Sequence, residues 1–122
     1  MRLSEHFTTE EFDCHDGTAV PVHARDDLRA LCRELLEPLR GEFGRVSIIS
    51  GYRTPAHNRS VGGAPHSFHV YRRDRRGAAA DLKCARGTPA DWYRWLDRHG
   101  APGLGRYSTH THVDNRVGRA RW

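Results

Sequence analysis

The chain has 122 residues and a formal net charge of +5, and Lys83 is its only lysine among twenty basic residues. This length suits one domain spanning residues 1–122, and no apolar run approaches the roughly 20 residues of a membrane span. Residues 1–6 lack the apolar segment of a signal peptide, so we expect a protein made in the cytoplasm.

The first half of the chain predicts two helices and a strand. Residues 8–11 (TTEE) form a capping box, which indicates a short helix pinned by Phe7 and Phe12. Six apolar residues between Leu28 and Leu39 recur at helical spacing and predict a helix over residues 26–40, ending at Gly41. Pro38 is expected to kink its last turn. The β-branched residues 46–50 predict a buried strand.

The second half alternates loops with short regular elements. Thr88 and Pro89 begin a predicted helix that carries Trp92 and Trp95 on its core face and ends at Gly100. The other predicted elements are a long loop over residues 51–65, a short strand at 68–71, an exposed turn at 72–76, a buried strand at 78–84 and a hairpin of 104–107 with 109–115. Two or three helices and short, mostly antiparallel strands make an α+β domain.

The three cysteines are Cys14, Cys32 and Cys84, which are far apart and form no C-x-x-C pair, so their spacing does not favour a zinc ribbon. Cys32 lies on the apolar stripe of the long helix and is expected to be a buried thiol. A Cys14–Cys84 disulfide is left open. Most of the nine histidines stand in polar contexts and are predicted to lie at the surface: His6, His15, His23, His57 and His99.

Three other residues, His69, Asp81 and His112, stand in contexts that favour chemistry. Asp81 follows a run of small apolar residues, and a carboxylate buried there needs a partner. Two histidines and one carboxylate are a donor set typical of catalytic zinc with one position open to water. A structural Asp–His pair explains the same residues, and spacing alone leaves both interpretations open.

Four motifs in order carry a family resemblance from about residue 5 to residue 116. They are SGYRTP at residues 50–55 with Asn58 and VGG at 61–63, then SFH at 67–69, GAAAD at 77–81 and HVD at 112–114. Together they resemble the zinc D-alanyl-D-alanine carboxypeptidase and L-alanyl-D-glutamate endopeptidase family. The resemblance implies a small hedgehog-like domain.

The resemblance also implies the roles of particular residues. His69, Asp81 and His112 are expected to bind one zinc ion, and Arg53 to contact a substrate carboxylate or the developing oxyanion. The planar fork of arginine suits both ligands. Ser67 is assigned to substrate binding.

The chain departs from the family pattern in two places. Asp81 follows His69 by twelve residues, a wider gap than relatives have, which we attribute to a turn lengthened at residues 72–76. Relatives carry an acidic general base where this chain has Thr109. In a strand, His110, His112 and Asp114 share one face, so His110 can take the proton from the attacking water. Asp114 either serves as a second catalytic candidate or orients a histidine ring.

We therefore expect a monomeric zinc peptidase that hydrolyses stem-peptide bonds of peptidoglycan and reaches the cell wall by phage-type or other delivery. A zinc-containing module of the same fold that binds wall peptide without cutting it is the alternative, favoured by Thr109. The arginine excess attracts polyanions, but no recognition helix or aromatic–basic motif indicates specific nucleic-acid binding.

Overall fold

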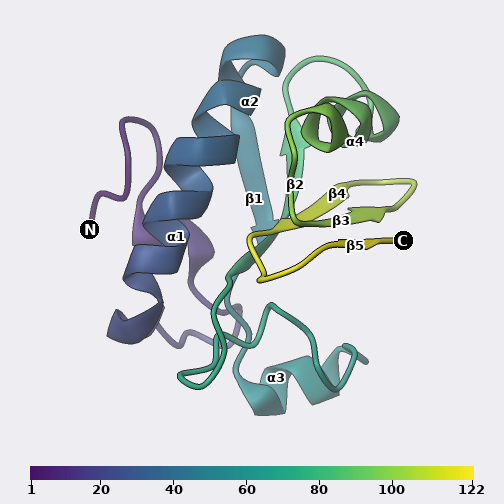
Figure 1. The fold of residues 1–122 in the computed structure, drawn as a ribbon. Helices are drawn as coiled ribbons and strands as arrows, with labels where there is room; N and C mark the ends of the chain where they lie inside the picture. Colours follow the sequence, from purple (N-terminus) through teal and green to yellow (C-terminus); the bar gives the residue numbers. More distant parts are fainter.

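A five-stranded sheet lies at the centre of the fold in the computed structural model, which describes residues 1–122 (Figure 1). The strands follow the order β1-β2-β4-β3-β5, and every neighbouring pair is antiparallel except β3 and β5. Their bounds are β1 Val46–Ser50, β2 Ala79–Cys84, β3 Gly103–Arg106, β4 Thr111–Asp114 and β5 Ala120–Arg121. The fold class is α+β, as the sequence predicted.

The fold contains three helices, two of which pack beside this sheet while the third lies at the lower end of the molecule in Figure 1. A long continuous helix comprises α1 Arg25–Leu31, the π-helical turn η3 Cys32–Leu36 and α2 Glu37–Phe43, and it follows the short 3₁₀ segments η1 Thr9–Phe12 and η2 Val22–Ala24. The helix α4 spans Pro89–Arg98, and α3 spans Pro55–Ser60. None of these helices combines the length and the apolar character needed to cross a membrane.

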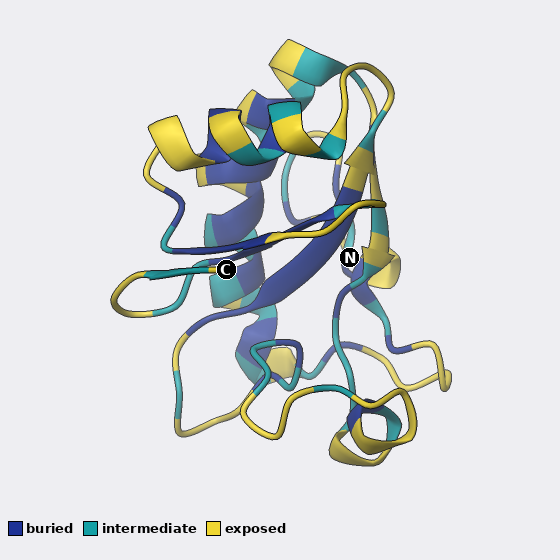
Figure 2. Ribbon diagram, turned by 90° about the vertical axis from the view of Figure 1, so that its right-hand side faces the viewer, coloured by how far each residue is buried: buried dark blue, intermediate teal, exposed yellow.

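The two faces of the sheet have different chemistry. Ala80 and Leu82 of β2 and Val113 of β4 belong to one apolar core together with the leucines of the long helix and the tryptophans of α4. Because side chains alternate along a strand, Asp81 and His112 project from the other face. The core is the dark region shared by the long helix and the sheet in Figure 2, whereas α3 and the loops beside it are largely exposed.

The capping signals of the sequence are confirmed. The Glu11 carboxylate accepts a hydrogen bond from the backbone N–H of Thr8, and Asp91 accepts one from that of Thr88, so each helix start satisfies donors that would otherwise be unpaired. Trp92 and Trp95 are buried in the core.

The long helix differs from its predicted bounds. It runs through Gly41 and stops at Gly44, whose φ of +77° suits glycine. The irregularity near Pro38 lies before it and not in the last turn as predicted: a π turn spans Cys32–Leu36, in which the Glu37 N–H donates to the Cys32 carbonyl, and a regular helix continues to Phe43. Proline has no N–H to donate, and its ring crowds the carbonyl four residues earlier, so a widened turn relieves the crowding.

Three further expectations about helices and strands were wrong or incomplete, and one question about the cysteines had been left open. Residues 51–65 contain α3, which Thr54 caps by accepting a hydrogen bond from the His57 N–H, and Pro55 occupies its first turn. Residues 68–71 form turns and not a strand. The short strand β5 was not predicted. All three cysteines are free, so no Cys14–Cys84 bridge forms.

Candidate metal centre

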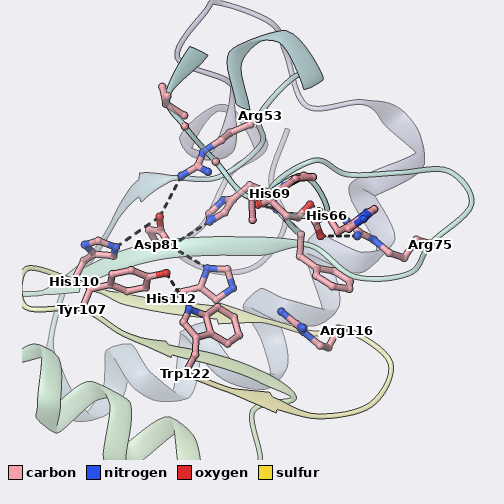
Figure 3. Close-up of a pocket in the computed structure, with 17 residues that line it drawn as sticks. Arg53, His66, His69, Arg75, Asp81, Tyr107, His110, His112, Arg116 and Trp122 are labelled. Atoms are coloured by element: carbon pink, nitrogen blue, oxygen red, sulfur yellow. Dashed lines mark hydrogen bonds and ion pairs between the residues drawn. The ribbon is translucent and has the colours of Figure 1, made fainter. Parts of the chain in front are cut away.

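His69, Asp81 and His112 converge on the polar face of the sheet (Figure 3). Asp81 lies in β2, His112 lies opposite it in β4, and His69 reaches them from the preceding loop. The His69 Nε2 and the His112 Nδ1 each lie 3.1 Å from the Asp81 Oδ1. All three side chains are buried, and one potential ligand atom from each lies within 4.8 Å of the others.

Hydrogen bonds on the far side of each ring fix the tautomers of the two histidines. The His69 Nδ1 lies 2.7 Å from the Gly51 carbonyl oxygen, which can only accept, so Nδ1 carries the proton. The His112 Nε2 lies 2.8 Å from Oδ2 of Asp114 and donates to it. In the neutral histidines, the nitrogens that face Asp81 therefore hold lone pairs.

Two imidazole lone pairs and a carboxylate oxygen pointing at one another require a cation between them. Either a proton or a metal ion can meet that need, and two nitrogens with one oxygen are a donor set that zinc accepts. Outer hydrogen bonds from ligand histidines to a carbonyl and a carboxylate are also typical of metal sites, since they fix ring orientation and raise basicity. The residues present fit a zinc ion.

Asp114 is the outer partner of His112. Its side chain is fully buried and accepts two hydrogen bonds from Arg116, one from Nε to Oδ1 at 2.8 Å and one from Nη2 to Oδ2 at 2.7 Å. Burial alone raises the pKa of this carboxyl, but hydrogen bonds from Arg116 and His112 outweigh it and hold the pKa well below the ordinary value. Asp114 therefore stays ionised beneath the His112 ring.

The candidate ligand side chains themselves have shifted pKa values. Burial lowers the pKa of His69, which favours the neutral ring that a metal requires. For His112, burial also lowers the pKa, but hydrogen bonds to Asp114 and Asp81 produce a net rise. Burial raises the pKa of Asp81, yet His112 and His69, which donate to this carboxylate when their rings are protonated, leave it well below the ordinary range.

Two cationic or ionisable side chains stand beside Asp81 without belonging to the triad (Figure 3). The Arg53 Nη2 lies 3.6 Å from Oδ2 of Asp81, and the His110 Nε2 lies 3.8 Å from the same oxygen. Arg53 is steadied by hydrogen bonds to Ser50 Oγ and Asn58 Oδ1. The other ring nitrogen of His110 lies 2.9 Å from the Thr109 hydroxyl, and its ring stacks on Tyr107 at 4.5 Å.

These residues open onto a cleft of about 680 Å³. The cleft has a basic wall, in which Arg75 and Arg116 lie over the Phe68 ring at 3.7 and 4.2 Å from its centre. Ser67 is half-buried at the edge of the cleft, and its hydroxyl accepts a hydrogen bond from the His69 N–H. Ser67 thus positions the backbone of His69, a candidate metal ligand.

A family model described as Peptidase M15 matches residues 5–114, which include all four motifs and the complete triad. The chain belongs to the peptidase M15 family. M15 enzymes are zinc-dependent peptidases, so membership makes this chain a metallopeptidase by family and implies a peptide substrate. A comparison with curated proteins found no match.

Twelve residue positions separate His69 from Asp81 in this M15 chain, and a turn occupies the middle of that span. Residues 72–76 form a mostly exposed turn, as predicted. Arg75 is the exception, since it folds back and donates to the carbonyls of His66, Ser67 and Val70. The lengthened turn thereby braces the loop that carries His69.

The sequence analysis missed part of the M15 cleft. Trp122 lies beside the candidate metal centre, with its ring 4.8 Å from that of His112 and its Nε1 donating to the Tyr107 hydroxyl. It reaches that place because β5 pairs with β3 and the Arg106 N–H donates to the Trp122 carbonyl. No local signal indicated this pairing.

One sequence signal could have indicated that side chains pack closely over β3, namely the two glycines at positions 103 and 105. A Cβ at Gly103 would collide with the Asp114 carboxylate, and one at Gly105 would lie 2.6 Å from the Trp122 ring. Glycines two residues apart in a strand share a face, so this pair marks a surface that other side chains approach closely.

Proposed function

We propose that this M15 chain is a zinc-dependent peptidase that hydrolyses stem-peptide bonds of peptidoglycan, as a D-Ala-D-Ala carboxypeptidase or an L-Ala-D-Glu endopeptidase. The observation that carries the proposal is the convergence of His69, Asp81 and His112 with their electron pairs facing one another, beside His110 and Arg53 in an open basic cleft.

In this proposal His69, Asp81 and His112 hold the metal. Zinc, when bound, supplies a Lewis acid for the scissile carbonyl and for the attacking water. Asp114 is a positioning residue: fully buried and held by Arg116, it keeps His112 in the tautomer that presents Nδ1 to the metal. That geometry replaces the expectation of Asp114 as a catalytic base, because its carboxylate cannot reach substrate.

His110 is the proposed general base. If its Nδ1–H donates to the Thr109 hydroxyl, its Nε2 keeps a lone pair directed toward the centre. Nε2 then takes a proton from the attacking water and returns it to the leaving amine. Thr109 stands where relatives carry an acidic general base. In this proposal it does not transfer the proton but orients the His110 ring.

Arg53 is proposed to bind the negative charge of the substrate. Its guanidinium stands at the cleft with Ser50 and Asn58 holding it in place. A peptide carboxylate or the developing oxyanion offers oxygen acceptors that match the planar fork. The cleft has no acidic side chain besides Asp81 among its lining residues, which favours an anionic substrate segment.

The experiment incubates the zinc-loaded protein with purified peptidoglycan and identifies the products by mass spectrometry. Free D-alanine indicates carboxypeptidase activity, and separation of stem peptides between L-alanine and D-glutamate indicates the endopeptidase. Peptidoglycan that is retained but uncut by the zinc-loaded protein favours the second candidate, a wall-binding module, for which Thr109 in the acidic position is the specific observation. Neither binding nor cleavage would overturn both.

A further inference from the structure

Cys14, Asp16 and His57 form a second cluster of metal-binding side chains outside the M15 centre. Cys14 and Asp16 lie in the loop after η1, and His57 lies in the first half of α3. One potential ligand atom from each lies within 4.8 Å of the other two. Cys14 is buried, His57 half-buried and Asp16 exposed, so the cluster runs from the interior to the surface.

The carboxylate of this cluster is held in place from two sides. Its Oδ1 accepts a hydrogen bond from the Thr18 N–H at 2.9 Å, and its Oδ2 accepts one from the Thr54 hydroxyl at 2.8 Å. Hydrogen bonds from Thr18 are the largest cause that lowers the pKa of Asp16, followed by those from Thr54 and Cys14. Asp16 is therefore an oriented anion beside a thiol.

The imidazole of His57 has no hydrogen-bond partner on either ring nitrogen, and the ring of His15 lies edge-on to it at 6.1 Å. A surface histidine with free nitrogens is ordinary by itself. Here the ring faces a thiol and a carboxylate on another segment of the chain, and these three donor types are the ones that zinc binds in proteins.

We propose that Cys14, Asp16 and His57 bind a second zinc ion. The ion is coordinated by the Cys14 sulfur, one Asp16 oxygen and one His57 ring nitrogen, with the fourth position open to water at the exposed side. Binding converts the Cys14 thiol to a thiolate and releases its proton to solvent. The oxygens of Asp16 keep their bonds to Thr18 and Thr54, which then act as outer partners.

This site joins two segments that meet at Arg53. The Tyr52 N–H donates to the Phe12 carbonyl at 2.7 Å, and Thr54 both accepts from the His57 N–H and donates to Asp16. Arg53 lies between these two anchored residues. A metal bridging Cys14 and His57 therefore fixes the start of α3 and stabilises the fold, independently of whether the M15 centre is active.

The test measures zinc per chain after removal of excess metal, together with the absorption spectrum of the cobalt-substituted protein. The wild type is expected to hold about two zinc ions, and Cys14→Ser or His57→Ala about one. The matched control, Cys84→Ser, alters a half-buried free thiol elsewhere and keeps both. A sulfur-to-cobalt charge-transfer band should be present in the wild type and absent from Cys14→Ser, since the M15 centre contains no sulfur.

His112→Ala separates this proposal from the proposed function. This variant is expected to lose the M15 metal yet keep one zinc ion and the sulfur-to-cobalt band. One zinc ion in the wild type with no sulfur band overturns the second site, as does unchanged stoichiometry in His57→Ala. His57→Ala alters only a half-buried surface ring, so circular dichroism should show a native fold even if Cys14→Ser, at a buried position, is destabilised.

Discussion

Asp81 of β2 and His112 of β4 are direct cross-strand partners, and this register sets the Asp81 Oδ1 3.1 Å from the His112 Nδ1. A slip of one residue would move either side chain to the opposite face of the sheet. The neighbouring pairs Ala80–Val113 and Leu82–Thr111 are buried on the core face and hold the register. The apolar core therefore positions two of the three proposed ligands.

Replacing His112 with alanine is expected to abolish zinc binding at the M15 centre, because only His69 and Asp81 remain as ligands. In the cobalt-substituted variant, the absorption of cobalt at the M15 centre should disappear. Competition with a chelator should show the lost zinc affinity of that centre directly. His66→Ala changes an exposed histidine at the cleft and should leave the metal in place. Full occupancy of the M15 centre in His112→Ala would remove His112 from the ligand set.

His110→Ala is expected to retain zinc and to lose about 10²–10⁴-fold in rate on stem peptides, the usual contribution of a general base. Thr109→Val should show a smaller loss, because the ring stays but its hydroxyl partner is gone. Equal rates for wild type and His110→Ala would assign the proton transfer to another group.

Changing Arg53 to lysine keeps the positive charge and removes the planar fork. We expect a fall of about 10-fold or more in kcat/KM with unchanged zinc content, because a lysine cannot make two parallel bonds to a carboxylate or keep both contacts to Ser50 and Asn58. Arg59→Lys, at an exposed position of α3, is the matched control. Wild-type kinetics in Arg53→Lys would restrict Arg53 to bracing its loop.

The metal-free protein should lose stability in acid. Asp81 and Asp114 have lowered pKa values, so their contribution is present above the ordinary carboxyl pKa of about 4 and is lost as pH falls through the folded-state values. Burial lowers the pKa of His69, so the neutral His69 ring stabilises the fold at higher pH and this stability is lost as pH falls below about 6.5. The pKa of His112 is raised, so its contribution has the opposite sign: it is present at low pH and is lost as pH rises through the folded-state value.

Denaturant unfolding of the metal-free protein between about pH 5 and pH 2 measures this dependence. Asp114→Asn should be less stable than wild type at neutral pH and should show a shallower decline in acid, since one of the two shifted carboxyls is gone. A decline as steep as that of wild type would mean that Asp114 does not carry the linkage.

Gly103→Ala should destabilise the fold by about 1–3 kcal/mol and weaken zinc binding, because its Cβ collides with the Asp114 carboxylate that orients His112. Gly41→Ala is the matched control: it lies in exposed helix with no atom within 4 Å of the added Cβ. That variant should gain about 0.5–1 kcal/mol. Calorimetry and metal competition on the two variants distinguish crowding at the site from a general effect of alanine.

Local signals in the sequence were sufficient for most elements. The leucine spacing from Leu28 to Leu39 predicted the long helix, the β-branched residues 46–50 predicted β1, and Thr88 with Pro89 predicted the start of α4. The family motifs placed His69, Asp81 and His112 in one proposed site, and membership in the M15 family is confirmed. The Thr54-Pro55 signal for α3 was present but was outweighed by the glycines that follow.

Only the tertiary structure decided how those residues meet. The strand order β1-β2-β4-β3-β5 brings Asp81 beside His112, the loop hydrogen bonds of Gly51 and Ser67 aim His69 at them, and β5 carries Trp122 over His112. Helix caps and hydrophobic spacing depend on residues a few positions apart, so they can be recognised in the sequence. Strand partners and outer ligands are chosen by packing between distant segments, which no local pattern encodes.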